Sequence, residues 1–104
     1  MILVFTAVPT NSVARRMAQA LVQERVAACV TILPNAQSIY RWKNKIEKTA
    51  ECLLLIKSTP AAFVKLKRQI QKLHPYEVPE IVCFKSTGIL SNYAAWMKSC
   101  VEAS

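Results

Sequence analysis

Short apolar runs with strand composition alternate with segments of helical periodicity, and this alternation constrains the fold more than any other feature of the chain. The first run, Ile2–Val8, has the length and the β-forming residues of a buried strand. Between Asn11 and about Arg25, apolar residues recur at helical spacing, and hydroxyl and amide side chains precede them as N-cap candidates. The opening therefore predicts a strand followed by a helix that lies on a sheet.

The middle of the chain predicts a long hairpin. Strand chemistry begins at Cys29–Leu33, is bent or bulged by Pro34-Asn35, and resumes over Ser38–Trp42. The polar turn Lys43-Asn44-Lys45 then leads to a partner strand at Glu51–Lys57. Because this hairpin is longer than the other strands can pair along, we expect its free edge and apolar surface to be covered by other copies in a closed ring.

The second half predicts a helix, a strand and a short final helix. Ser58-Thr59-Pro60 begins the first of these helices, and Ile81–Lys85 has strand composition. Ser91-Asn92 is a candidate cap for the last helix. The expected inner residues of the two helices are Phe63, Leu66, Ile70 and Leu73 in the first, and Tyr93, Trp96, Met97 and Val101 in the second. The element order predicts an α+β fold, a ferredoxin-like βαββαβ sheet with an additional C-terminal helix, in a single domain spanning 1–104.

The connector His74-Pro75-Tyr76-Glu77-Val78-Pro79-Glu80 places an imidazole, a phenol and two carboxylates between a helix and a strand. Each proline fixes its own φ and biases the residue before it toward extended backbone. Such a rigid polar segment suits a binding surface. The alternative is that the two prolines only end a helix and begin an edge strand.

Fourteen Lys and Arg against six Asp and Glu give a net charge of +8, which raises the question of a polyanionic partner. The basic residues are scattered over every predicted element, without the motifs of common nucleic-acid-binding domains. Nucleic acid is therefore an unlikely partner. Local concentrations at 41–48 and 65–72 keep phosphate or polyanion binding open as an alternative.

The apolar start of the chain lacks the basic leading segment and cleavage pattern of a signal peptide, and no run reaches membrane-spanning length. We therefore expect a cytoplasmic protein that does not engage a membrane. Its four cysteines should be reduced, and their apolar neighbours predict that they are buried: Cys29, Cys52, Cys83 and Cys100.

Several segments together resemble the CutA divalent-cation tolerance family. They are the opening strand, Ala27-Ala28-Cys29-Val30, Ser38-Ile39-Tyr40-Arg41-Trp42, Leu54-Leu55-Ile56-Lys57-Ser58-Thr59, the connector His74–Glu80, and Tyr93-Ala94-Ala95-Trp96. The resemblance implies a ferredoxin-like fold, a tight homotrimer built by sheet packing and long hairpins, and an architecture similar to PII-type signalling proteins. It also implies an association with tolerance of copper and other divalent metals, and no settled enzymatic reaction.

Some members of that family carry cysteines where this chain has Phe5 and Gln69, so any metal site here has fewer thiolates. No cofactor is required; copper or another divalent cation is the candidate ligand. Imidazole and carboxylate suit Cu(II), and the ligands would have to converge by folding or from two subunits, which predicts weak binding. Cys29 fits a core position as well as a ligand. The candidate metal ligands are His74, Cys29, Glu77 and Glu80.

A second class of function is a PII-like signalling or adaptor trimer that binds a small anionic ligand in a cleft between subunits. Trp42 and Trp96 could instead pack the oligomer. The candidate lining is Tyr40, Trp42, Lys57, His74, Tyr76, Glu80 and Trp96.

Catalysis has little support, because the chain has a single glycine, Gly88, hence no glycine-rich phosphate loop, and no recognisable nucleophile motif. The sequence thus predicts a non-enzymatic, cytoplasmic homotrimer for divalent-metal tolerance, with copper as the leading ion.

Overall fold

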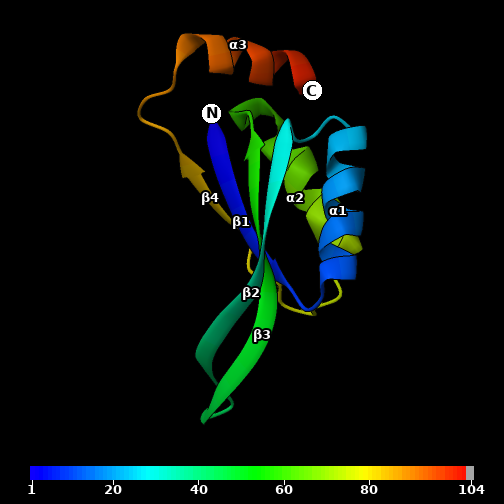
Figure 1. Cartoon of the computed structure of the whole chain (residues 1–104), viewed down its shortest axis with the longest axis vertical. Coiled ribbons are helices and arrows are strands. Elements are labelled where there is room, and N and C mark those ends of the chain that lie inside the picture. Colours follow the sequence, from blue (N-terminus) through cyan, green and yellow to red (C-terminus); the bar gives the residue numbers. More distant parts are fainter. Residues whose placement is uncertain (103–104) are drawn as a thin grey trace.

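The computed structural model describes residues 1–102, and its four strands form one sheet in the order β2-β3-β1-β4 with every neighbouring pair antiparallel (Figure 1). This order confirms the predicted ferredoxin-like α+β fold with an added C-terminal helix. None of the helices in this part of the chain is long and apolar enough to cross a membrane. The elements are β1 (Ile2–Val8), α1 (Asn11–Gln23), β2 (Cys29–Trp42), β3 (Lys45–Ser58), the 3-10 turn η1 (Pro60–Ala62), α2 (Phe63–Leu73), β4 (Val82–Lys85) and α3 (Ser91–Cys100).

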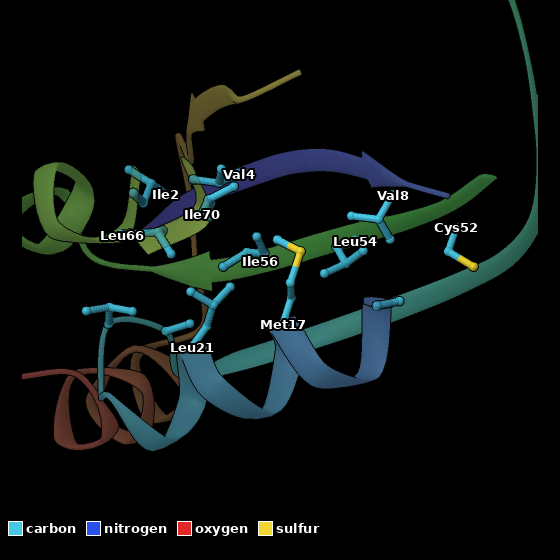
Figure 2. Packing of buried hydrophobic residues seen from close by; sticks show 13 residues of the cluster. Ile2, Val4, Val8, Met17, Leu21, Cys52, Leu54, Ile56, Leu66 and Ile70 are labelled. Carbon is cyan, nitrogen blue, oxygen red and sulfur yellow. The ribbon is translucent and has the colours of Figure 1, made fainter. Parts of the chain in front are cut away.

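The main core lies between the sheet and the layer formed by α1 and α2. Side chains alternate along β1 and β3, so one set of positions on each strand is buried toward the helices and the other set is only partly covered. Figure 2 shows Met17 and Leu21 of α1 against the central strands, together with the fully buried Leu54 and Ile56 of β3. Leu66 and Ile70 of α2 complete this core.

Helix ends follow the predicted capping chemistry in two cases and depart from it in a third. The hydroxyl of Thr10 accepts a hydrogen bond from the Val13 N–H at 3.1 Å at the start of α1. The Thr59 hydroxyl accepts from the Ala62 N–H at 3.3 Å, so the predicted second helix begins with one 3-10 turn. The predicted cap at Ser91-Asn92 is wrong, because α3 starts at Ser91 after Leu90 without any side-chain cap.

The hairpin of β2 and β3 is longer than predicted and projects beyond the rest of the molecule (Figure 1). With the hairpin included, the longest dimension of the molecule is 45 Å. Lys43 and Asn44 both have positive φ, 50° and 65°, which is the geometry of a two-residue turn that continues straight into paired strands. The partner strand therefore begins at Lys45 rather than at Glu51. The predicted bulge is present, as a register shift between Leu33 and Ala36.

The sheet face turned away from α1 and α2 is apolar and only partly covered; we call it the open face. Leu3 and Phe5 of β1, Leu55 of β3 and Phe84 of β4 lie on it, and Phe84 is 52% exposed. The rings of Phe5 and Phe84 are 5.3 Å apart. The second core cluster, which includes Met97 of α3, lies elsewhere, so the open face needs another partner.

Burial corrects some predictions about single residues. Only Cys52 among the four cysteines is fully buried; Cys83 is exposed, and Cys29 and Cys100 are half-buried. All four are free thiols. Leu73 and Trp96, expected on inner helix faces, are 38% and 46% exposed. In each case the residue lies in an apolar stretch of sequence, but one copy of the chain does not have enough surrounding structure to bury it.

Replacing Leu54 with alanine should cost about 2 to 5 kcal/mol of unfolding free energy, since its side chain is fully enclosed between sheet and helices. Val64→Ala on α2 is the matched control, because that side chain is 59% exposed and the change should stay within about 0.5 kcal/mol. Guanidinium denaturation at one protein concentration would measure both. Equal losses in the two variants would contradict this account of the core.

Candidate functional site

The single histidine of the chain, His74, hydrogen-bonds the connector to the sheet. His74 follows α2 directly, is buried, and its Nε2 lies 2.8 Å from the carbonyl oxygen of Ala7 at the end of β1. A carbonyl can only accept, so Nε2 carries the proton and donates. Nδ1 in turn accepts from the Tyr76 N–H at 3.1 Å. Both ring nitrogens are thus engaged with backbone, which fixes one neutral tautomer.

The surroundings of His74 favour that neutral form. Burial is the largest influence and lowers the pKa of His74 below its ordinary value; the bond to Ala7 and the charge of Glu51 oppose this more weakly. The imidazole is therefore a structural tie between α2, β1 and the connector.

A second tie joins the connector to the hairpin. The phenol of Tyr76 donates to the Oε2 of Glu51 on β3 at 2.7 Å, and its ring lies 4.8 Å from the ring of His74. Burial, then the bond and charge of Glu51, raise the pKa of Tyr76 well above its usual range. The phenol stays protonated and keeps donating, so the connector holds a fixed position over the open face.

A cleft of about 680 Å³ lies between the connector and the part of the hairpin on the open-face side. Two aromatic side chains of β2, Tyr40 and Trp42, form part of its wall, and the Tyr40 hydroxyl is hydrogen-bonded to Thr49 Oγ1 at 3.0 Å. We call this the acidic cleft, because three carboxylates line it. Its lining residues are Ala7, Ser38, Tyr40, Trp42, Glu51, Pro75, Tyr76, Glu77, Val78 and Glu80.

Three carboxylates, Glu51, Glu77 and Glu80, line the cleft, and none of its lining residues is lysine or arginine. In a chain of net charge +8 this is a local reversal of sign. A cleft lined by one sign of charge attracts ligands of the opposite sign. The electrostatics therefore favour the predicted cation over the small anionic ligand of the alternative function.

The structure brings together four of the seven predicted cleft residues, Tyr40, Trp42, Tyr76 and Glu80. The other three do not line it within one copy. The Nζ of Lys57 donates to Thr31 Oγ1 at 2.6 Å farther along the open face, His74 is engaged by backbone, and Trp96 is on α3. Their place in a cleft between copies stays a prediction.

Glu51 is the one charged lining residue of the cleft that neither predicted site included. The sequence pattern places it at the start of a strand and gives no signal for its partner, because its bond to Tyr76 spans 25 residues of sequence. Glu51 pairs with Ala36 of β2 across the hairpin, after the bulge has shifted the β2–β3 register. The sequence does not specify the size of that shift.

The four predicted metal ligands do not form a metal site within one copy. Across residues 1–102 no three His, Cys or acidic side chains come close enough together to hold a metal ion. His74 has no free ring nitrogen, and the Sγ of Cys29 lies 3.7 Å from the Nζ of Lys57 on the open face. Glu77 and Glu80 are exposed on the connector. A site shared between copies stays a prediction.

Lowering the pH from 7.5 to 5.5 should destabilise the fold partly through His74. In the unfolded chain the imidazole takes up a proton near pH 6.5, whereas the lowered pKa keeps the folded imidazole neutral to lower pH. The unfolded state therefore binds more protons, and the free energy of unfolding decreases as the pH falls. His74→Gln removes the only histidine and should lose this component. Denaturation midpoints of both proteins at pH 7.5, 6.5 and 5.5 would measure it; parallel pH curves would contradict the assignment.

Comparison with known proteins places the chain among proteins of similar sequence along nearly its whole length. The family model described as CutA1 divalent ion tolerance protein matches residues 2–100. A divalent-cation tolerance protein CutA of Thermus thermophilus is 47% identical over 95 residues, which are 91% of this chain and 92% of that protein.

Two solved structures show the same agreement in three dimensions. The structure of the divalent cation tolerance protein Cut A1 from Thermus thermophilus has a TM-score of 0.94 at 45% identity, covering 98% of this chain and 100% of the other. The PII-like protein CutA from Nostoc sp. PCC 7120 has a TM-score of 0.93 at 33% identity, covering 100% of both chains. The chain therefore belongs to the CutA1 divalent ion tolerance family.

Proposed function

We propose that the protein acts in tolerance of divalent cations as a cytoplasmic, non-enzymatic homotrimer that binds a cation weakly and reversibly at the acidic cleft of each copy. Copper is the leading ion. The observation that carries the proposal is the negative charge of the cleft, which Glu51, Glu77 and Glu80 line without any basic residue in a chain of net charge +8. Within residues 1–102 these three carboxylates are not close enough together to ligate one ion jointly, so charge attraction contributes more than coordination.

Weak binding follows from how these carboxylates are used. Glu51 already accepts the phenol proton of Tyr76, so it contributes charge more than a free ligand atom. Glu77 and Glu80 are exposed and belong to a connector stiffened by Pro75 and Pro79, which keeps them at one rim of the cleft. Few ligands in an open site give a low affinity, which suits a protein that responds to metal rather than storing it.

Trimer formation is supported by the open face. Leu3, Phe5, Leu55 and Phe84 present a continuous apolar surface on one side of the sheet, while the helices cover only the other side. Trp42, near the end of the projecting hairpin, is 52% exposed. Contiguous apolar surface of this kind marks a contact between copies, and the cleft would then lie beside a subunit boundary.

A second candidate function is that of a PII-like sensor whose cleft holds a small organic cation. The cleft volume of about 680 Å³ is within the range of small-molecule sites, and Tyr40 and Trp42 supply aromatic walls that suit an ammonium group. Because none of the residues that line the cleft is basic, such a ligand is favoured over the small anion of the alternative function.

Titration calorimetry of the thiol-reduced protein with Cu(II) tests the primary function. Glu77→Gln combined with Glu80→Gln should weaken Cu(II) binding by about tenfold or more, because each change removes a charged ligand or neighbour. The matched control, Glu24→Gln with Glu102→Gln, removes two carboxylates from outside the cleft and should leave Cu(II) binding unchanged.

Equal Cu(II) affinities in the two double variants would refute a metal role for the acidic cleft. A parallel titration with choline separates the second candidate, since a sensor for organic cations would bind choline with a loss confined to the Glu77/Glu80 variant. If neither ligand binds the wild type, both functions of the cleft are wrong.

Phe84→Glu should convert the assembly into smaller species, because the open face would then carry a charge into an apolar contact between copies. In a single copy this side chain is 52% exposed, so the fold itself should tolerate the change. Val64→Glu on α2 is the control of the same chemistry on the helix layer. Sedimentation velocity would measure both, and an unchanged mass for Phe84→Glu would contradict assembly through the open face.

A further inference from the structure

We propose that a second site, on the helix layer, binds the oligophosphate group of a small molecule. A cavity of about 300 Å³ lies between the end of α1, the exposed face of α2 and the segment that follows α3. Arg25, Lys65, Arg68 and Lys72 line it, and we call it the basic cavity. It shares no lining residue with the acidic cleft, so this proposal is independent of the proposed function.

The three basic residues of α2 reach the cavity because of their spacing. Lys65, Arg68 and Lys72 are three and four residues apart, which puts them on one side of the helix, and Gln69 adds an amide beside them. All three cations are exposed, whereas the opposite side of α2 is buried in the core.

Arg25 closes the cavity from the other side and is held in place there. It has a positive φ of 60° just after α1, and its guanidinium donates to the carbonyl oxygen of Ser99 near the end of α3 at 3.1 Å. Its own carbonyl accepts from the Glu102 N–H at 2.9 Å. These two bonds bring the end of α3 beside the end of α1, as Figure 1 shows, and they leave other guanidinium donors of Arg25 unused.

The cations of the cavity lack ion-pair partners. Within the described chain, none of the four forms an ion pair within 4.0 Å, although Glu24 and Glu102 also line the cavity. Four cations against two carboxylates leave an excess of positive charge in a small volume. A multiply charged anion would relieve this repulsion, and the planar arginine side chains can bind phosphate oxygens in a bidentate manner.

The size and mixed charge of the cavity narrow the ligand class. A volume of about 300 Å³ is at the lower end for small-molecule sites, which suits a compact chain of two or three phosphates. Glu24 and Glu102 interrupt the basic surface, so it does not form the uniform stripe that a long nucleic acid would follow. Orthophosphate carries too few negative charges to engage both Arg25 and the cations of α2, so we expect it to bind more weakly than a chain of two or three phosphates.

The experiment is calorimetric titration of the 104-residue chain with sodium tripolyphosphate at low ionic strength. Arg68→Gln combined with Lys72→Gln should weaken binding by about tenfold or more, because two charge-assisted contacts are lost. Lys43→Gln with Lys45→Gln removes the same charge from the hairpin turn and should change the affinity less than about twofold, since a distant exposed charge is screened. Thermal melting would check that both variants remain folded.

Removing negative charge from the cavity, instead of positive charge, should change the affinity in the opposite direction. Glu24→Gln with Glu102→Gln removes the carboxylates of the cavity and should tighten tripolyphosphate binding by about threefold or more. Titration with ATP separates two sources of the same group: affinity equal to that of tripolyphosphate indicates that the phosphates alone are bound, and higher affinity indicates a nucleotide. Either result supports the site if the Arg68/Lys72 variant loses the binding and the Lys43/Lys45 control keeps it.

Three outcomes would overturn the proposal. Equal losses in the Arg68/Lys72 and Lys43/Lys45 variants would assign binding to net charge alone. No saturable heat with tripolyphosphate at low salt would show that the cavity has no such ligand. Tighter binding of a single-stranded RNA oligomer, lost only in the Arg68/Lys72 variant, would identify the surface as a contact for a macromolecule instead.

Discussion

The antiparallel pairing of β1 with β3 is the constraint on which the rest of the structure depends. It runs in unbroken register from Ile2 opposite Ser58 to Val8 opposite Cys52. Because strand side chains alternate, this register sends one set of residues into the helix layer and the other set to the open face. A slip by one residue would exchange the two sets and expose the core. The helix-side core and the open face follow from this one pairing, and the pairing of β2 with β3 adds the hairpin wall of the cleft.

The connector has a defined position because its polar groups bond to parts of the sheet that are distant in sequence. His74 bonds to the carbonyl of Ala7 on β1, and Tyr76 bonds to Glu51 on β3. Buried polar groups are costly unless paired, so these bonds both stabilise the fold and fix where Glu77 and Glu80 stand. His74, one of the predicted metal ligands, has both ring nitrogens engaged by backbone within one copy. Its carboxylate neighbours are the groups left free to meet a ligand.

Charge in this protein is divided between two regions of opposite sign. The acidic cleft is built on the open-face side of the hairpin, and the basic cavity lies on the helix layer among α1, α2 and the end of α3. The net charge of +8 therefore does not reveal that one region, the acidic cleft, is negatively charged. A cation at one site and an oligophosphate at the other would each be bound by unpaired charge, and their separation means that one ligand need not exclude the other. Such a pair of sites fits a protein that responds to the ionic composition around it.

The sequence alone determined the order of elements, the bulge in β2, the turn at Lys43-Asn44 and the need to cover an apolar sheet face, because periodicity and turn chemistry are local properties. It also predicted Tyr40, Trp42, Tyr76 and Glu80 for a cleft between copies, and within one copy these four residues line the acidic cleft. The tertiary structure alone decided that His74 has no free nitrogen, that Glu51 belongs to the cleft, and that Arg25 joins the basic residues of α2. The bonds of His74 to Ala7 and of Tyr76 to Glu51 join residues 67 and 25 positions apart, and the second depends on the pairing of β3 with β1. Local sequence patterns carry no information about such distances, whereas folding sets them through the packing of helices on the sheet.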